Sequence, residues 1–368
     1  MSGLKAVGLI SAAGLSSRMG AFKPFLNLDG TPLLCRTVES LLDGGVQEIV
    51  VVTGRNGDAV TQMLSRYPQV KTIYNEHYAE TAMYDSIKLG LQQIQDCDVL
   101  LFLPADVPAI RPETVQVLLK HWMQKKPDVL FPVYQEKQWH PPVISGNLLP
   151  KLLEYSGEAG LKGALETICE THEQLLVPDK GCTMDADYTE EYQEICRYWK
   201  QRDIPDAVIC ETLYELAETP EPVQLHCKAV AEKAMELANI VEKQGVTLNR
   251  ELLYGAALLH DVCRTEKNHA EAGAVFLRQY GFYRLADLIA VHMDWPEDKV
   301  LEPNEATILY LADKLVSGNQ AVSLEQRFAE KIEKYAEQTE IAEKIRQRLK
   351  TAIAIQQMIT TADTGNET

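Results

Sequence analysis

Two groups of residues in this sequence have the types and spacing that chemistry on phosphate compounds requires. The first lies in a glycine-containing stretch, SAAGLSSRMGAFK at residues 11–23, in which Arg18 and Lys23 flank Gly20. Small residues let a ligand approach the backbone closely, and backbone amides with fixed positive charge bind phosphate oxygens. An apolar run at residues 6–10 precedes this stretch and is too short for a helix, so the pattern predicts a buried strand that ends in a phosphate-binding turn.

Acidic residues that could hold a metal ion follow in the same half of the chain. Asp106 comes directly after the apolar run LLFLPA, and Asp185 and Asp187 precede a predicted helix at 189–200. Mg²⁺ prefers carboxylate oxygens and bridges phosphates, so Asp106, at the end of a predicted strand, is a candidate metal ligand. Helix capping is the alternative role for Asp106 and Asp187, because a predicted helix begins soon after each of them.

The second group consists of histidines and aspartates that lie within helical patterns of the carboxyl-terminal half. Four of the eight histidines of the chain fall between residues 226 and 292, and the pair His260–Asp261 ends the apolar run AALL. Burying an imidazole beside a carboxylate is costly unless a positive charge such as a divalent metal satisfies them. A lone helical histidine is more often an ordinary polar residue, so the prediction of a metal site depends on the whole set, which is His226, His260, Asp261, His269, His292 and Asp313.

The first two hundred residues, which must position the first group, alternate between strand-like and helix-like patterns. Strands are predicted at residues 6–10, 48–54, 70–75 and 98–106, and helices at 81–94 and 189–200. Thr31 with Pro32 predicts a further helix start, and Gly44 predicts its end. Such alternation is typical of an α/β fold with a mostly parallel sheet and helices on both faces. Ligands then lie beyond the carboxyl ends of the strands, where Gly14 and Asp106 both fall.

The second half of the chain has a different pattern, which predicts a separate all-helical domain. Proline-containing breaks lie at residues 201–220, and the apolar spacing that follows is helical. The expected helices are 223–244, 250–263, 270–280 and 305–316, with a charged helical end at 325–358. The predicted organisation is a first domain at 1–200, a linker at 201–220, a helical domain at 221–362 and a tail at 363–368.

Composition excludes several classes of protein. A formal net charge of -17 argues against an extended nucleic-acid-binding surface, so any polyphosphate site must be a local positive pocket. The eight cysteines form no C-x-x-C pair, and no apolar run approaches the ~20 residues that span a bilayer. With no secretion signal, these features predict a cytoplasmic protein that binds neither nucleic acid nor membrane.

The glycine-containing stretch resembles the signature of the MobA-like nucleotidyltransferases, A-A-G-x-S-x-R-M-G-x-x-K. The matching positions are Ala12, Ala13, Gly14, Ser16, Arg18, Met19, Gly20 and Lys23. The spacing fits neither a P-loop nor the dinucleotide fingerprint. Its A-A-G form is more typical of the molybdenum cofactor cytidylyltransferase branch. The resemblance implies a Rossmann-like domain in which the terminal phosphate of molybdopterin attacks the α-phosphorus of CTP and releases pyrophosphate.

The resemblance also implies roles for individual residues. Arg18 and Lys23 would act on the triphosphate together with Asp106, which would hold Mg²⁺, and the other matching residues would bind the nucleotide. In the segment MDADYTEEY, Asp187 would be the second Mg²⁺ ligand, with Asp185 as the alternative. The acceptor would lie near Ser86 and His140; Ala82 and Trp139 stand where the family usually has glycine, and an ordinary surface turn is the alternative for His140.

The histidine and aspartate set resembles that of the HD-domain phosphohydrolases, whose ligands follow the order H…HD…D. That order matches His226, His260, Asp261 and Asp313, while His269 and His292 match the extra histidines of branches that hold two metals. The resemblance implies bound Fe or Mn, in one or two ions that would activate a water for phosphoester hydrolysis. A sensor role is the alternative, and the sequence does not identify a substrate.

Together these patterns predict a bifunctional enzyme, a molybdenum cofactor nucleotidyltransferase followed by a metal-dependent HD phosphohydrolase. One alternative keeps the fold but uses a sugar or alditol phosphate as the acceptor. Another is a protein without catalytic activity that binds the cofactor and delivers it to a molybdenum hydroxylase. Turnover of CTP with molybdopterin discriminates the first hypothesis from both alternatives.

Overall fold

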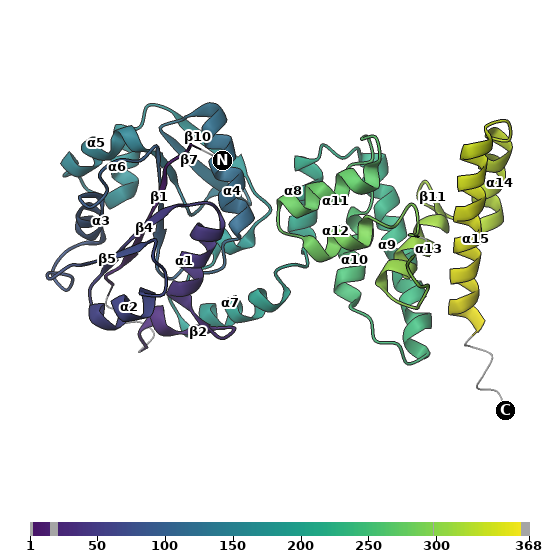
Figure 1. Cartoon of the computed structure of the whole chain (residues 1–368), viewed down its shortest axis with the longest axis horizontal. Coiled ribbons are helices and arrows are strands. Elements are labelled where there is room, and N and C mark those ends of the chain that lie inside the picture. The colour runs from purple at the N-terminus through teal and green to yellow at the C-terminus, as the bar shows by residue number, and fades with distance from the viewer. Residues whose placement is uncertain (1–2, 15–20, 297, 362–368) are drawn as a thin grey trace. The chain divides into compact units, whose positions relative to one another are not determined.

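The computed structural model describes residues 3–14, 21–296 and 298–361 of the chain. Its backbone divides into two compact units, Met1–Arg202 and Asp203–Thr368 (Figure 1). The first unit contains the mixed α/β structure, and the second is almost entirely helical. The predicted fold class, an α/β domain with a mostly parallel sheet followed by a helical domain, is therefore confirmed. Arg18, Ser16 and Gly20 lie outside the described residues.

The N-terminal unit is built on one eight-stranded sheet with the strand order β10-β7-β9-β6-β1-β4-β5, and β8 pairs with β7. The strands are β1 Ala6–Ala12, β4 Glu48–Thr53, β5 Val70–Tyr74, β6 Val99–Pro104, β7 Val129–Tyr134, β8 Lys137–Gln138, β9 Val143–Ser145 and β10 His172–Leu176. β1 lies between β6 and β4 and is parallel to both. Among the described strands of this sheet, only the short strands β9 and β8 run antiparallel to their neighbours. Neither strand was predicted, because β9 has three residues and β8 has two, which is too few for a recognisable sequence pattern.

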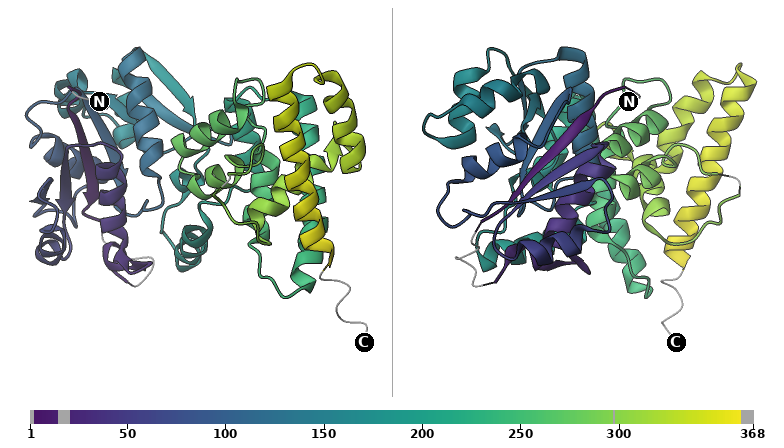
Figure 2. Two further views of the ribbon diagram at one scale, coloured as in Figure 1. Left: turned by 45° about the vertical axis from the view of Figure 1, so that its right-hand side comes forward. Right: turned by 60° about the vertical axis from the view of Figure 1, so that its left-hand side comes forward.

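Helices cover both faces of this sheet (Figure 2). They are α1 Leu33–Asp43, α2 Gly57–Leu64, α3 Met83–Leu91, α4 Pro112–Lys125, α5 Leu149–Glu154, α6 Gly160–Ile168 and α7 Thr189–Gln201. α1 packs against α4, whereas α3 packs against β1, β4, α5 and α6. The expected helix start at Thr31 was wrong. Thr31–Pro32 is instead strand β3, paired with β2 Asn27–Leu28, because Asp29 and Gly30 adopt positive φ and form a tight hairpin turn.

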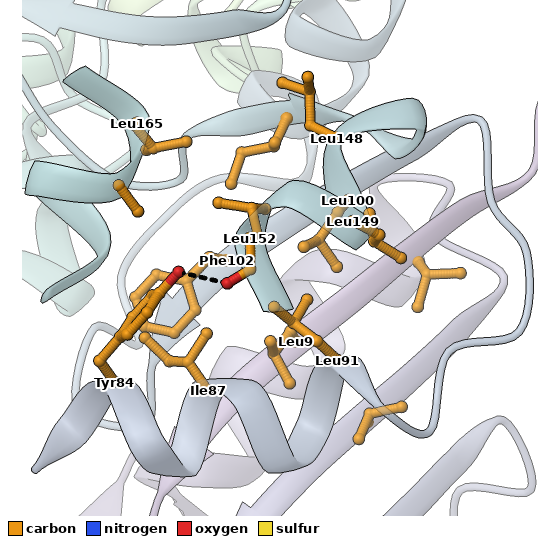
Figure 3. Packing of buried hydrophobic residues seen from close by; sticks show 14 of the residues in the cluster. Leu9, Tyr84, Ile87, Leu91, Leu100, Phe102, Leu148, Leu149, Leu152 and Leu165 are labelled. Carbon is orange, nitrogen blue, oxygen red and sulfur yellow. Dashed lines mark hydrogen bonds between the residues drawn. The ribbon is translucent and has the colours of Figure 1, made fainter. Parts of the chain in front are cut away.

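The core on the α3 face holds the strand ends in place. Leu9, Leu100 and Phe102 from the sheet pack with Ile87 of α3 and Leu152 of α5 (Figure 3). The Tyr84 hydroxyl donates a hydrogen bond to the Leu152 carbonyl at 2.8 Å, which ties α3 to α5. A Cβ on Gly90 would lie 2.4 Å from a methyl carbon of Leu9, so glycine permits the close packing of α3 on β1.

The C-terminal unit consists of helices joined by short turns and one small hairpin. Its elements are α8 Ala207–Leu216, α9 Glu221–Lys243, α10 Arg250–Leu259, α11 His269–Gln279, α12 Tyr283–Ile289, α13 Glu305–Lys314, β11 Val316–Ser317, β12 Gln320–Ala321, α14 Leu324–Lys334 and α15 Thr339–Thr361. Residues 207–216, within the expected linker, are helical. The β11–β12 hairpin was not predicted, and α10 ends at Leu259, so that His260 is its capping residue.

The α3-face core makes a prediction about stability. Leu152→Ala removes a side chain with no exposed surface, so the free energy of unfolding of the N-terminal unit should fall by about 2–5 kcal/mol. Hydrogen exchange of the β1 and β6 amides measures this loss. The matched change Leu225→Ala, at a site 45% exposed on α9, should alter the stability of its own unit by less than about 1 kcal/mol. Equal losses in both variants would contradict the assignment of the core.

Candidate functional site

The carboxyl ends of β1 and β6 form one edge of a cavity of about 260 Å³ in the N-terminal unit. The two strands are in register from Ala6 opposite Val99 to Ser11 opposite Pro104, and the Ala105 amide donates a hydrogen bond to the Ser11 carbonyl at 3.0 Å. The residues that line the cavity are Ser11, Ala12, Ala13, Gly14, Lys23, Pro24, Tyr78, Thr81, Met83, Ser86, Pro104, Ala105, Asp106 and Asp187. Parallel sheets place ligands at such strand ends.

Lys23 links two carboxylates in this cavity. Its Nζ lies 2.9 Å from Oδ2 of Asp106 and 2.5 Å from Oδ1 of Asp187. Burial alone would lower the pKa of Lys23, but the hydrogen bonds that it donates to Asp187 and Asp106 raise the pKa above its ordinary value. The Ala186 amide also donates to the Asp106 carbonyl at 3.1 Å, which holds the 184–187 segment against the end of β6. Residues that are distant in the sequence therefore converge on one cation.

Asp185 and Asp187 face different spaces. Asp187 lines the cavity that contains Lys23, whereas Asp185 lines a larger neighbouring cavity. Burial raises the pKa of Asp185, and the carboxylates of Asp106, Glu191 and Asp187 raise it further. The arrangement therefore places Asp187, rather than Asp185, opposite Asp106.

Ala12, Ala13 and Gly14 form the described part of the predicted phosphate-binding turn. Ala12 and Ala13 are nearly fully buried, while Gly14 is exposed in the cavity wall. A Cβ on Gly14 would meet no described atom within 4 Å, so packing within the described protein does not explain why a glycine is here. Close approach of a ligand to the backbone would explain it.

The larger cavity, of about 1020 Å³, shares Met83 and Pro104 with the smaller one, and its wall includes the aromatic residues Tyr84, Phe102, Phe131 and Trp139. His140 lines it, with its ring centroid 6.1 Å from that of Phe102. Burial lowers the pKa of His140, and its Nδ1 has no hydrogen-bond partner among the described residues. Ser86 instead lines the smaller cavity, where its hydroxyl accepts a hydrogen bond from Asn75 at 3.0 Å. The two predicted acceptor residues thus face adjoining cavities.

The sequence did not single out the aromatic wall of the larger cavity. Tyr84, Phe131 and Trp139 contribute to it from three separate segments, and Tyr78 lines the smaller cavity. The only available signal was the segment 75–91, which contains the two tyrosines, because hydrophobic residues in a binding pocket have the same sequence pattern as residues of the core.

In the C-terminal unit, all six predicted metal-ligating residues lie in one cluster. Asp261 Oδ1 lies 3.1 Å from Nε2 of His269 and 3.4 Å from Nε2 of His292. Asp313 Oδ1 lies 3.2 Å from Nε2 of His226 and 3.6 Å from Nε2 of His260. Two overlapping sets of three ligand atoms, each within 4.8 Å of one another, therefore share Asp261. Such an arrangement has room for two ions a few Å apart.

Backbone carbonyls orient three of the four imidazoles. Nδ1 of His226 lies 2.6 Å from the Gly318 carbonyl, that of His260 lies 2.8 Å from the Ala257 carbonyl, and that of His292 lies 2.6 Å from the Ile289 carbonyl. An Nδ1–H that donates to a carbonyl leaves Nε2 with a free lone pair directed into the cluster. This is the tautomer that a metal ligand needs.

The unsatisfied atoms of the cluster are the strongest sign of a metal site. Nε2 of His260, Nε2 of His292 and Oδ1 of Asp261 are buried and have no hydrogen-bond partner among the described residues. Leaving three such atoms unsatisfied is costly, and divalent metal coordination would satisfy them all. Burial also lowers the pKa of His292 to about 4, which keeps its imidazole neutral, as a ligand must be. The donor set of nitrogen and carboxylate oxygen suits a transition metal.

A buried lysine balances part of the negative charge of the cluster. Lys314 Nζ lies 2.9 Å from Oδ2 of Asp313 and 2.5 Å from the His292 carbonyl. Burial alone would raise the pKa of Asp313, but Lys314, followed by His226 and His260, holds it well below its usual range. Lys314 was not predicted to belong to this cluster, although it is adjacent to the predicted ligand Asp313 in the chain.

The two sites define a nucleotidyltransferase with a second, metal-binding centre. Residues 8–175 match the MobA-like NTP transferase domain, and residues 223–318 match the HD domain, a class that binds divalent metal. The chain therefore contains a MobA-like NTP transferase domain and an HD domain.

Several curated proteins are similar to the N-terminal part of the chain. The molybdenum cofactor cytidylyltransferase of Escherichia coli is 23% identical over 184 residues, which are 50% of this chain and 92% of that protein. The 2-aminoethylphosphonate cytidylyltransferase of Lancefieldella rimae is 33% identical over 96 residues, 25% of this chain and 39% of that protein. The choline-phosphate cytidylyltransferase of Haemophilus influenzae is 34% identical over 97 residues, 25% of this chain and 41% of that protein. The chain thus spans less than half the length of the last two relatives.

Two solved structures are similar to about half of this chain. A nucleotidyl transferase from Methanothermobacter thermautotroptrophicus is 21% identical and covers 54% of this chain and 99% of its own, with a TM-score of 0.46. The molybdopterin-guanine dinucleotide biosynthesis protein A from Archaeoglobus fulgidus is 18% identical and covers 53% of this chain and 99% of its own, with a TM-score of 0.41.

No helix among the described residues has the length and hydrophobicity to cross a membrane.

The shared ligand set makes a prediction about metal content. His260→Gln removes a buried ligand atom from the centre of the cluster, so the divalent metal recovered per chain after anaerobic purification should fall at least ~10-fold. Elemental mass spectrometry measures the content. The matched change His172→Gln, in strand β10 of the other unit, should leave it unaltered. Equal metal content in the wild type and in His260→Gln would contradict the assignment.

Proposed function

We propose that the N-terminal unit transfers a cytidylyl group from CTP to the terminal phosphate of molybdopterin. The observation that carries this proposal is the position of Lys23, held between Asp106 and Asp187 in the cavity at the ends of β1 and β6. A cation and two carboxylates beside an exposed glycine turn can bind a metal–triphosphate complex. The similarity to the molybdenum cofactor cytidylyltransferase of Escherichia coli, over 92% of that protein, supports the acceptor, and three cytidylyltransferases among the relatives support CTP.

In the proposed reaction an oxygen of the molybdopterin phosphate attacks the α-phosphorus of CTP, and the bond from that phosphorus to the bridging oxygen breaks. Pyrophosphate leaves with the electron pair of that bond. The backbone at Ala13 and Gly14, together with Lys23 and Arg18, would bind the triphosphate and offset its charge. Ser16 and Gly20, which lie outside the described residues, are also proposed to bind the nucleotide, and Ala12 would leave room for the base. The contribution of the protein is positioning and electrostatic stabilisation.

The residues of this site fit Mg²⁺. Asp106 and Asp187 each place a carboxylate oxygen within 2.9 Å of the same ammonium nitrogen, so both oxygens converge on a place that a cation occupies. Asp106 and Asp187 would hold Mg²⁺, which would neutralise developing charge on the phosphates when bound. Lys23 would then be available to the triphosphate.

The large aromatic cavity suits a flat heterocyclic acceptor. This cavity, of about 1020 Å³, adjoins the smaller cavity that contains Lys23, and its wall includes Phe102, Phe131, Trp139 and His140. Aromatic walls bind planar rings by stacking, and a few polar groups fix their orientation. The unpartnered Nδ1 of His140 is such a group, and we propose that it contacts the acceptor.

We further propose that the C-terminal unit is a phosphohydrolase that uses Fe or Mn, in one or two ions. His226, His260, Asp261, His269, His292 and Asp313 would hold the metal, which would supply an activated water for attack on phosphorus. The carbonyl-oriented imidazoles keep the ligand atoms in place, and Lys314 offsets the charge of Asp313.

CTP turnover tests the proposal for the N-terminal unit. The purified protein should release pyrophosphate from CTP in the presence of molybdopterin and Mg²⁺, and Asp106→Asn should lower kcat at least ~10²-fold, because it removes charge where the phosphates react. A coupled pyrophosphate assay measures the rate. The control Asp96→Asn, exposed near the other end of β6, should retain the wild-type rate.

Other results of that assay would identify a different function. Activity with a sugar or alditol phosphate and none with molybdopterin would identify the sugar or alditol phosphate as the acceptor. Binding of molybdopterin and of a molybdenum hydroxylase, without turnover of any nucleotide, would indicate a delivery protein and would exclude the transferase reaction.

A phosphatase assay tests the proposal for the C-terminal unit. With Mn²⁺, the protein should release phosphate from at least one compound in a panel of nucleotides and pterin phosphates, and Asp313→Asn should lower the rate at least ~10²-fold. Asp287→Asn, on the exposed face of α12, is the matched control and should have no effect. Equal activity in all three proteins would assign the phosphate release to a contaminant.

A further inference from the structure

A second cavity of about 260 Å³ opens beside the metal cluster of the C-terminal unit. His226, Asp261 and Asp313 form part of its wall, so a molecule in this cavity reaches the metal ligands directly. The wall also carries a group of cations, which are Arg264, Lys314, Arg327, Lys331 and Arg348. Cations that face a common cavity beside a metal site indicate an anionic ligand.

Three of these cations have carboxylate partners. Lys314 and Arg264 contact the carboxylates of the cluster itself, at 2.9 and 3.6 Å. Arg348 forms two hydrogen bonds with Asp294, at 2.6 and 2.8 Å. Their charge is therefore largely offset within the protein.

Arg327 and Lys331 are different, because neither forms an ion pair with a carboxylate within the described part of the chain. They lie one turn apart on α14 and line the same cavity. Arg327 donates to the neutral Ser317 hydroxyl at 3.0 Å, and Lys331 has no ion-pair or hydrogen-bond partner among the described residues. Burial, followed by the charge of Arg327, lowers the pKa of Lys331 to about 8, although the charge of Asp313 acts in the opposite direction. Like charges at this spacing destabilise a helix, and a bound anion would relieve the repulsion.

The β11–β12 turn connects these cations to the metal cluster. The Gly318 carbonyl lies 2.6 Å from Nδ1 of the ligand His226, and the adjacent Ser317 hydroxyl accepts the hydrogen bond from Arg327. Two adjacent residues thus position one metal ligand and one cation of α14. α14 itself lies beyond residues 223–318, the part that matches the HD domain.

We propose that Arg327 and Lys331 bind the second phosphate of a diphosphate group whose first phosphate lies at the metal cluster. This inference rests on the proposed phosphohydrolase function and names its substrate class. A cavity of about 260 Å³ is smaller than the ~300–1,000 Å³ typical of drug-sized ligands, so a compact anion fits it better than a whole nucleotide does. Free pyrophosphate and the diphosphate end of a nucleotide present the same chemistry, and the reaction proposed for the N-terminal unit releases the former.

Isothermal titration calorimetry of the full-length protein, loaded with Mn²⁺, tests this proposal. The probes are methylenediphosphonate, which resists hydrolysis, and inorganic phosphate. In the double variant Arg327→Gln/Lys331→Gln, the Kd for methylenediphosphonate should rise at least ~10-fold, because charge-assisted hydrogen bonds are lost. The Kd for inorganic phosphate should change less than about 3-fold, and the Mn²⁺ content should stay the same.

The matched control is Lys334→Gln/Arg346→Gln, which also removes one lysine and one arginine from α14 and α15. Lys334 lies over the Tyr335 ring and Arg346 pairs with Glu343, and neither lines the cavity. This variant should bind both probes as the wild type does. An equal loss of methylenediphosphonate affinity in the control would overturn the proposal, because the effect would then come from net charge.

The remaining outcomes separate this inference from the proposed function. An unchanged Kd for methylenediphosphonate in the double variant, or an equal weakening for phosphate, would overturn the diphosphate site even if hydrolysis is observed. The expected binding pattern without hydrolysis of any compound would leave the diphosphate site standing and remove the phosphohydrolase function. Titrations with pyrophosphate and CDP distinguish the two sources: tight binding of pyrophosphate alone supports the free anion, and tight binding of both supports the nucleotide end.

Discussion

Carboxylates brought together from distant parts of a chain repel one another, and both units of this protein meet that constraint with cations at fixed positions. In the N-terminal unit, Lys23 lies between Asp106 and Asp187, which are 81 residues apart in the sequence. In the C-terminal unit, Asp313 contacts Lys314 and the imidazoles around it. The strand ends and helix ends of each unit converge where these charges are balanced, so the fold and the chemistry depend on the same contacts.

The sequence predicted much of the architecture because its strands are strongly apolar and its ligands have characteristic spacing. The alternation of strand-like and helix-like patterns over residues 6–106 predicted the parallel strands. The order of histidines and aspartates in the second half predicted the six-residue cluster. Thr31 was misplaced because a threonine followed by proline is typical both of a helix start and of a short extended segment. The aromatic cavity and the cations of α14 were not predicted, because pocket residues and solvated helix charges have no distinctive local pattern.

The two sites also differ in how the protein fixes their geometry. In the C-terminal unit, main-chain carbonyls of three separate segments orient the imidazoles, so the ligand atoms are positioned before metal binds. In the N-terminal unit, the Lys23 side chain joins the two carboxylates, and the Ala186 amide donates a hydrogen bond to the main-chain carbonyl of Asp106. The first arrangement favours a resident metal, whereas the second suits a cation that arrives with the nucleotide.

The turn that carries Ser317 and Gly318 has a consequence for how such a protein can diverge. Residues up to this turn include the six proposed metal ligands, and α14 and α15 after it contribute Arg327, Lys331 and Arg348 to the cavity. The proposed metal centre and these three cations therefore belong to successive segments that meet at a two-residue junction. Exchange of the terminal helical pair between homologues would then change the cations of the cavity without changing any proposed metal ligand.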